Sequence, residues 1–345
     1  MHLEVRRRRW RLTLGLMAAL LLGISVAATG LGTVPVPVGE VLRAIGDAVV
    51  SGVNRQDTNS VIVVMLRLPR IALGSLVGAS LALAGATLQG LFRNPMADPY
   101  IVGISSGASL GATIAMALAL RFSLLGLGAV PVFAFVGALG SLAVVYNIAR
   151  EGPRLPVVPL LLSGVAVGAF LQAIVSFIML MSDEKLRSIF LWLMGGLAGS
   201  TWTDVRAVLP YFLLGSGVLL WQANNLNVIL LGDEQALYLG VEVDQVKRWA
   251  LAAASLITAA AVSVSGLIGF VGLVVPHMVR LIVGPDHRVL LPASALGGAI
   301  ILVLADTVAR TALAPTEIPV GIITAITGGP FFIYLLRRYR RARSI

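Results

Sequence analysis

Side chains that could carry catalysis are few in this sequence, and their spacing does not favour an enzyme. The segment Gly103-Ile104-Ser105-Ser106-Gly107 matches the G-x-S-x-G pattern that presents a nucleophilic serine in many hydrolases. That pattern works at a strand-to-helix turn with a histidine and an acid within reach. Here it opens a long apolar stretch, and the only histidines are His2, His277 and His287. An intramembrane serine hydrolase therefore stays a minor alternative.

Nucleotide and metal chemistry lack their usual motifs. The only lysines are Lys185 and Lys247, and neither follows a glycine, which excludes the P-loop that binds ATP phosphates. The sequence contains no H-E-x-x-H and no cysteine, so no zinc-protease helix, thiolate site or disulfide is expected. We expect no catalytic residue, no metal and no cofactor, and any ATP-driven step must use another chain.

The composition predicts an all-α polytopic membrane protein. Of 345 residues, 58% are hydrophobic and only 12% are charged, whereas a soluble domain has about a quarter charged. Apolar blocks long enough to cross a hydrocarbon core, which takes about 20 residues in a helix, recur from end to end. Glycines four apart, such as Gly107 and Gly111, predict close helix packing.

The net charge of +10 is concentrated at the two ends of the chain. Five arginines lie in 6–11 and five in 337–343, both beside apolar helices. This is the positive-inside pattern, so we expect both termini in the cytoplasm, an even number of spans and no nucleic-acid partner. The protein should lie in the cytoplasmic (inner) membrane.

Hydropathy and parity together predict about ten transmembrane helices in a single domain, 1–345. The spans are 12–32, 64–92, 100–120, 125–149, 157–181, 205–221, 249–270, 272–284, 289–312 and 319–336. Pro276 and the glycines Gly266, Gly269 and Gly272 favour dividing 249–284 into two spans. Segments 33–60 and 182–204 should then be periplasmic, each with a short surface helix, and 222–248 cytoplasmic.

The segment 222–249 is the longest polar interruption. Leu226, Ile229 and Leu230 fall on one helix face. Asp233 then suits the start of a second helix, and Gly240 its end in a left-handed cap. Two short helices outside the lipid are predicted, with a plain hydrophilic loop as the alternative.

Three arginines, Arg67, Arg70 and Arg310, fall at the outer ends of spans two and nine, against the charge bias. A local explanation is an i, i+4 ion pair between Asp306 and Arg310, with Arg67 and Arg70 reaching lipid headgroups. The functional alternative is a basic patch that docks acidic groups of a partner. The residues alone leave these two readings open.

Several motifs occur in an order that is similar to the FecCD family of ABC importer permeases. They are LRLPR at 66–70, RNPMADP at 93–99, GISSGA at 103–108, WLMGG at 192–196, LGDEQA at 231–236, IGFVGL at 268–273, GPDHR at 284–288, EIPVG at 317–321 and GPFF at 329–332. The resemblance spans about 38–337 and implies the type II ABC importer permease fold, with ten helices per subunit.

The resemblance implies a homodimer with a central pore, two cytoplasmic ATP-binding subunits and a periplasmic substrate-binding protein. It implies that Arg67, Arg70 and Arg310 dock the binding protein. It also implies that the cytoplasmic helices receive the motion of the ATPase. The residues assigned to that coupling are Leu231, Gly232, Asp233, Glu234, Ala236, Leu239 and Gly240. An iron chelate (siderophore or haem) is the expected cargo, with cobalamin as the alternative.

One departure concerns the cytoplasmic gate. Vitamin B12 permeases have small hydroxyl residues just before span five, where this sequence has Val157 and Val158. An apolar constriction can close a pore by excluding water, so we expect a hydrophobic gate there. An ion-coupled secondary transporter is the less favoured alternative, because it would need ionisable groups at mid-membrane and the candidates lie near span ends.

Overall fold

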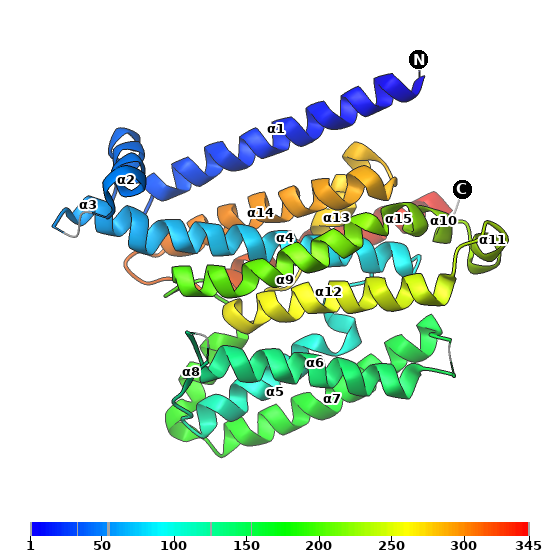
Figure 1. Ribbon diagram of the computed structural model, residues 1–345. Helices are drawn as coiled ribbons and strands as arrows, with labels where there is room; N and C mark the ends of the chain where they lie inside the picture. Colours follow the sequence, from blue (N-terminus) through cyan, green and yellow to red (C-terminus); the bar gives the residue numbers. More distant parts are fainter. Residues whose placement is uncertain (1, 33, 54–55, 125, 153, 344–345) are drawn as a thin grey trace.

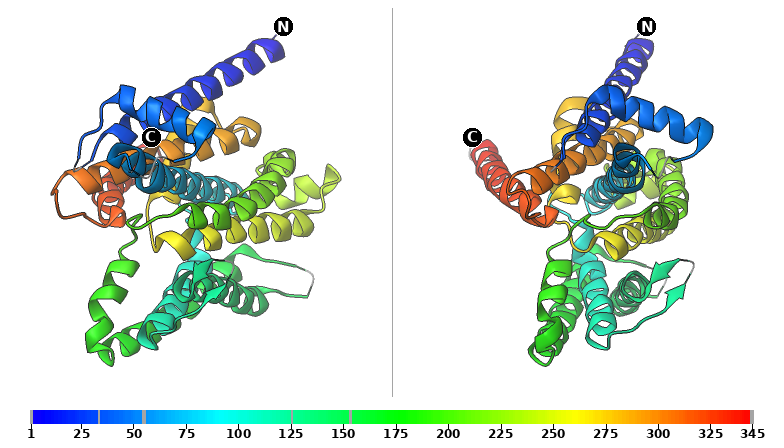
Figure 2. Two further views of the ribbon diagram at one scale, coloured as in Figure 1. Left: turned by 60° about the vertical axis from the view of Figure 1, so that its left-hand side comes forward. Right: turned by 90° about the vertical axis from the view of Figure 1, so that its left-hand side faces the viewer.

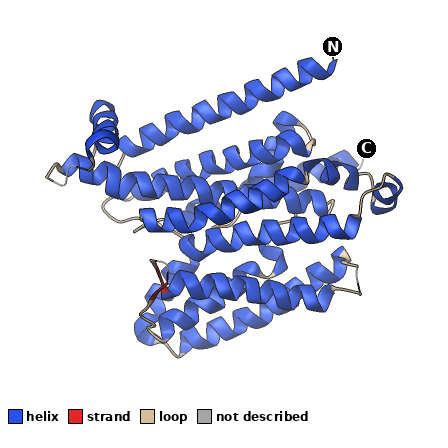
Figure 3. Cartoon of the chain, in the orientation of Figure 1, coloured by secondary structure: helices blue, strands red, loops and turns tan. Residues whose placement is uncertain are grey.

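The computed structural model describes residues 2–32, 34–53, 56–124, 126–152 and 154–343, and these are almost entirely helical (Figure 3). Seven helices are long and apolar enough to cross a membrane. They are α1 (His2–Gly30), α4 (Leu68–Leu91), α6 (Ala129–Ala149), α7 (Val157–Leu180), α9 (Trp202–Trp221), α12 (Val243–Ser265) and α14 (His287–Thr311). Three shorter apolar helical stretches are α5 (Ile104–Ala117), α13 (Val271–Val283) and the part Val320–Tyr334 of α15 (Val320–Arg343). Together these correspond to the ten predicted spans.

The remaining elements are short and connect the long helices. They are α2 (Val38–Ser51), α3 (Thr58–Val61), the π-helix η1 (Ile62–Arg67), the 3₁₀ helices η2 (Pro99–Val102) and η3 (Asp183–Lys185), α8 (Leu186–Leu193), α10 (Ala223–Ile229) and α11 (Asp233–Tyr238), and the antiparallel strands β1 (Ser123–Leu124) and β2 (Leu127–Gly128). The predicted surface helices at 38–50 and within 182–199 are present as α2 and as η3 with α8.

Helix α4 is the centre of the bundle (Figure 1). It packs against α9, α12, α13 and α14, and most of its residues are buried. Helices α5, α6 and α7 form a second group, which is joined to the first through contacts of α12 with α5 and α6. Helix α1 packs along the outside of α14, and α15 packs against α13 and α14 at another edge of the bundle (Figure 2). The long helices thus lie side by side, as spans of one membrane would.

Small residues allow this close packing. A Cβ added at Gly78 of α4 would collide with the carbonyl of Gly298 in α14, and one added at Gly298 with the carbonyl of Gly78. Gly107 and Gly137 make the same reciprocal approach between α5 and α6. Lipid provides no hydrophobic driving force between helices. The close backbone contacts at these glycines therefore provide the van der Waals attraction that holds the helices together. The packing role predicted for glycines four apart is confirmed at Gly107.

The predicted division between spans seven and eight is present, and it falls at the predicted glycines and not at the proline. The chain breaks at 266–270, where Gly266 and Phe270 both take positive φ angles of +66° and +68°. Pro276 lies inside α13, not at the break. The predicted boundary of span three is also wrong, because 99–102 forms η2 and α5 begins only at Ile104. The turns at 266–270 and 99–103 therefore shorten spans seven and three relative to the prediction.

Candidate functional site

The polar stretch 222–249 folds as the two short helices that the sequence predicts, α10 and α11. Leu226 and Ile229 are fully buried, whereas Leu230 is 38% exposed, so only part of the predicted apolar face meets the bundle. Helix α10 packs on α4 and α14. Helix α11 projects at one end of the molecule (Figure 1), where it contacts α10 and α12. This end of the bundle is the candidate coupling site.

Helix α11 ends in a Schellman motif. Gly240 has φ +81°, its N–H donates to the carbonyl of Leu237 at 2.9 Å, and the N–H of Val241 donates to the carbonyl of Ala236 at 3.0 Å. These bonds satisfy the carbonyls that the helix end leaves free. The left-handed cap predicted at Gly240 is therefore present, and it sets the angle at which α11 returns to α12.

The surface of α11 is apolar where a solvated loop would be polar. Leu231, Leu237, Tyr238 and Leu239 are 63%, 60%, 91% and 63% exposed, while Ala236 is fully buried beneath them. A contiguous exposed apolar patch marks an interaction surface. Leu237 and Tyr238 were not among the predicted coupling residues, although three consecutive large apolar residues, Leu237 to Leu239, at the end of so short a helix cannot all face the bundle.

Ion pairs tie α11 to its neighbours. Asp233, in the first turn of α11, accepts from the Nζ of Lys247 at 2.6 Å, and Lys247 itself is buried in α12. The guanidinium of Arg93, in the turn after α4, lies 3.4 Å from the same carboxylate. Asp233 therefore joins α11 to α12 and to the turn after α4.

Asn227 links α10 to the start of α14. Its Oδ1 accepts from the backbone N–H of His287 at 2.8 Å and lies 2.9 Å from the Nδ1 of the same residue. Its Nδ2 donates to Asp286 at 2.8 Å. Because Oδ1 can only accept, Nδ1 of His287 carries the proton. Sequence reasoning did not single out Asn227, whose hydrogen bonds join α10 to α14.

Asp286 completes this link as the N-cap of α14. Its carboxylate accepts from the N–H of Arg288 and forms an ion pair with the Arg288 side chain at 2.6 Å. The hydrogen bond from the Arg288 guanidinium, with that from Asn227, holds the pKa of Asp286 well below its usual range. Its charge at neutral pH favours the N-terminus of α14.

Asp98, in the turn between α4 and α5, faces a cavity of about 460 Å³ between α7 and α13. Gly164 and Gly168 of α7 and Phe270 at the start of α13 also line it. The carboxylate of Asp98 accepts from the N–H of Tyr100 at 2.8 Å. Burial nevertheless raises the pKa of Asp98 to about 6, with the hydrogen bond from Tyr100 only partly offsetting it.

The titration of Asp98 should make the protein less stable as the pH rises. A carboxyl with a raised folded-state pKa stabilises the fold below its unfolded pKa, and this contribution is lost as the pH rises through about 6. The loss should be on the order of 3 kcal/mol. Thermal unfolding measured between about pH 4.5 and about pH 8 tests this. Asp98→Asn should be more stable than wild type only at the upper end of that range. An equal pH dependence in both proteins would contradict the assignment.

The three outer arginines lie together, but the guanidinium groups of Arg67 and Arg310 point into the protein. Arg67 is 7% exposed and donates to the carbonyls of Thr29, at 2.7 Å, and Val34. Arg310 is 5% exposed and donates to the carbonyl of Ala28. The arginines therefore hold the end of α1 and the following loop against the bundle.

Arg70 makes two carboxylate contacts. It binds Asp306 through Nε at 2.9 Å and Nη2 at 2.8 Å, and Glu317 through Nη1 at 2.9 Å. The i, i+4 pair of Asp306 with Arg310 is also present, with 3.8 Å between Nε and Oδ2. A cavity of about 330 Å³ opens beside Arg67, Arg70, Arg310 and Glu317. Of the two carboxylates, Glu317 has the more exposed side chain, at 38% against 4% for Asp306.

The two valines of the predicted gate differ in their surroundings. Pro156 precedes the first turn of α7, Val157 packs against the core, and Val158 is 65% exposed. The segment Gly103–Gly107 follows the 3₁₀ helix η2 instead of a strand, and Gly107 packs on α6. That arrangement does not form the strand-to-helix turn that a serine nucleophile elbow needs.

The bundle of apolar helices, with an apolar docking surface at one end, is that of a multi-pass membrane permease of an ABC importer. The model of the FecCD transport family matches residues 16–338, and the chain belongs to that family. It is 58% identical to a cobalamin import system permease (BtuC) of Halobacterium salinarum, over 81% of this chain and 74% of the relative. It is 45% identical to the hemin transport permease HmuU of Yersinia pestis, over 81% of this chain and 84% of the relative.

A solved structure shares the fold. It is described as a metal-chelate type ABC transporter in an inward-facing conformation, and it superimposes with a TM-score of 0.82 at 34% identity, covering 94% of this chain and 98% of the other. The vitamin B12 import permease of Salmonella arizonae is 38% identical over 97% of this chain and 96% of the relative. The predicted family and fold class are confirmed.

Proposed function

We propose that this permease carries a metal chelate across the cytoplasmic membrane, driven by ATP hydrolysed in two separate cytoplasmic subunits. The observation that carries the proposal is the exposed apolar surface of α11, held by Asp233 and Gly240 and linked to α4, α12 and α14. The sequence has no P-loop of its own, so this surface is where a separate ATPase would act.

The proposed cargo is an iron chelate, as siderophore or haem, with a corrinoid as the second candidate. The hemin permease of Yersinia pestis supports the first, at 45% identity. The cobalamin permease of Halobacterium salinarum supports the second, at 58% identity. All of these are large metal complexes, for which a pore between subunits with weakly binding walls is suitable.

Uptake into proteoliposomes tests both the energy source and the cargo. The permease would be reconstituted with its co-purifying ATP-binding subunit and offered labelled haemin, a ferric hydroxamate or cyanocobalamin. ATP-dependent uptake of one of these supports the proposal. Uptake driven by a proton gradient without the ATP-binding subunit would replace it with an ion-coupled secondary transporter.

The proposed assembly is a homodimer with both termini in the cytoplasm and a periplasmic binding protein on the opposite face. Helix α7 supports the dimer, because only four of its 24 residues are buried within one chain. Its exposed residues include Leu162, Val165 and Phe170. A second copy packed on α7 would cover this face and enclose the pore.

We propose that the surface formed by the outer arginines docks acidic residues of the binding protein, with Arg70 making the direct contact because Arg67 and Arg310 are engaged with backbone carbonyls. We also propose that Glu317 competes for Arg70 in the free permease. Glu317→Gln should tighten docking about fivefold, because it removes a competing exposed ion pair that contributes roughly 1 kcal/mol. Arg70→Glu should abolish docking. Glu151→Gln, at an exposed loop position beyond α6, is the matched control. Binding-protein affinity measured by surface plasmon resonance decides, and an unchanged value for Glu317→Gln would contradict the competition.

We propose that Val158, with Val157 behind it, forms the apolar gate at the cytoplasmic end of α7. Replacing both by serine should wet the constriction and raise passive leak of the substrate from proteoliposomes without ATP. Leu213→Ser, at an exposed position of α9 outside the proposed dimer face, is the control. A leak no higher than that of wild type would remove these valines from the gate.

A further inference from the structure

A groove between α6 and α12 is not explained by transport, docking or coupling. It has a volume of about 630 Å³, within the ~300–1,000 Å³ range of clefts that hold small ligands. One wall is a stripe of α12 in which Gln245, Arg248, Trp249 and Ala252 are all exposed. These positions follow i, i+3, i+4 and i+7, so they lie on one helix face.

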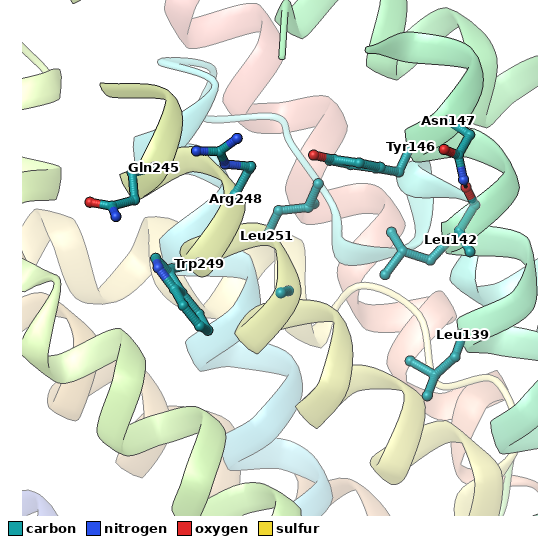
Figure 4. A pocket seen from close by; sticks show the side chains of 10 residues that line it. Leu139, Leu142, Tyr146, Asn147, Gln245, Arg248, Trp249 and Leu251 are labelled. Carbon is teal, nitrogen blue, oxygen red and sulfur yellow. Dashed lines mark hydrogen bonds between the residues drawn. The ribbon is translucent and has the colours of Figure 1, made fainter. Parts of the chain in front are cut away.

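The facing wall is a stripe of α6 with the same periodicity, from Leu139 and Leu142 to Tyr146 and Asn147. The two helices run in opposite directions, so the end of α6 meets the beginning of α12. Polar and aromatic groups of both helices therefore gather at one end of the groove. Figure 4 shows Arg248, Tyr146 and Asn147 at the same level on facing helices, with Leu142 and then Leu139 further along. From Tyr146 to Leu139 the groove extends about 10 Å along the helix axis.

Arg248 supplies a charge without a counter-charge in the protein. Among the described residues no carboxylate lies within ion-pair distance of its guanidinium. Asp244, one turn earlier in α12, accepts instead from the backbone N–H of Leu155. An exposed guanidinium is well suited to bind a phosphate through two parallel hydrogen bonds.

We propose that this groove binds one anionic phospholipid, with the phosphate at Arg248 and an acyl chain along Leu142 and Leu139. Trp249 and Tyr146 have the amphipathic rings that favour the headgroup region of a bilayer. The order of polar and then apolar contacts along the groove matches the order of headgroup and chain in a phospholipid. The groove lies at the same end of the bundle as α11, so the lipid comes from the leaflet on the coupling side. The inference rests on the membrane placement of the chain and not on its cargo or partners.

Lipid binding at this position would restrain the start of α12, which also carries Lys247. Lys247 holds Asp233 of α11, so the groove adjoins the coupling site. An anionic headgroup on Arg248 therefore fixes the helix on which α11 is anchored, while leaving the exposed surface of α11 free.

Native mass spectrometry of the full permease, released from equimolar phosphatidylglycerol and phosphatidylcholine, tests the proposal. Wild type should retain phosphatidylglycerol in preference to phosphatidylcholine. Arg248→Ala should lower that preference about fivefold, as expected for one basic residue at a membrane surface. Arg154→Ala is the matched control, since Arg154 is exposed in the loop after α6 and does not line the groove.

A second variant separates the chain-binding part from the charge. Ala252→Phe fills the groove from an exposed position and keeps Arg248, so it should lower the total amount of retained lipid. Retention and preference equal to wild type in both Arg248→Ala and Ala252→Phe would overturn the proposal. Loss of ATP-binding-subunit association in Arg248→Ala, with lipid retention unchanged, would also overturn it and assign Arg248 to that subunit.

Discussion

Gly240→Pro is expected to reduce ATP-driven uptake at least about tenfold while ATP hydrolysis by the partner continues, a change that corresponds to roughly 1.4 kcal/mol or more. Gly240 has φ +81° and donates to the carbonyl of Leu237. Proline holds φ near −65° and has no N–H to donate. The Schellman motif at the end of α11 cannot form, so the exposed surface of Leu237 and Tyr238 loses its fixed angle to α12.

The measurement is uptake and ATP hydrolysis side by side in the same proteoliposomes. Gly52→Pro is the matched control, because Gly52 ends α2 with nearly the same angle, φ +82°, and has open space around it as Gly240 has. A Gly240→Pro permease that transports at the wild-type rate would show that the end of α11 does not transmit the motion.

Asn227→Ala is expected to destabilise the permease by roughly 2–4 kcal/mol and to lower the cargo carried per ATP hydrolysed. The change leaves the backbone N–H and Nδ1 of His287 without their acceptor, and His287 is fully buried. It also removes the donor to Asp286, the N-cap of α14. Buried groups that lose a hydrogen-bond partner cost more than the bond contributes when formed.

Asn224→Ala is the control on the same helix, since Asn224 is exposed. Thermal unfolding measures the stability, and the ratio of uptake to ATP hydrolysis measures the coupling. Asn227→Asp sharpens the test, because it keeps the acceptor for His287 but places a second carboxylate against Asp286. Equal unfolding temperatures for the Asn224 and Asn227 variants would contradict the role of Asn227 as the link between α10 and α14.

The coupling site could be predicted in part because its signals are local. A carboxylate at Asp233 and a glycine at Gly240 mark the beginning and end of a helix through backbone groups only a few residues away. The apolar surface was only half predicted. Leu231 and Leu239 were assigned to it, but Leu237 and Tyr238 were not, since helix periodicity does not say which face of a six-residue helix remains uncovered.

Residues that act across the fold were beyond that reasoning. Asn227 and His287 are 60 positions apart, and they meet because α10 packs on α14. The same applies to Arg70, whose partners Asp306 and Glu317 lie 236 and 247 positions away. The sequence placed the arginines at the outer ends of their spans. It could not show that two of them turn inward onto backbone carbonyls.

Hydropathy, charge bias and motif order were enough to establish a ten-helix FecCD permease, because burial in lipid imposes its pattern on every span separately. The exposure of Val158 against the packing of Val157 and the groove beside Arg248 were set by how the helices pack. A side chain's partners depend on which helices are neighbours and at what rotation, and in a uniformly apolar chain many rotations satisfy the same hydropathy pattern. Close backbone approaches such as Gly78 on Gly298 select one of them.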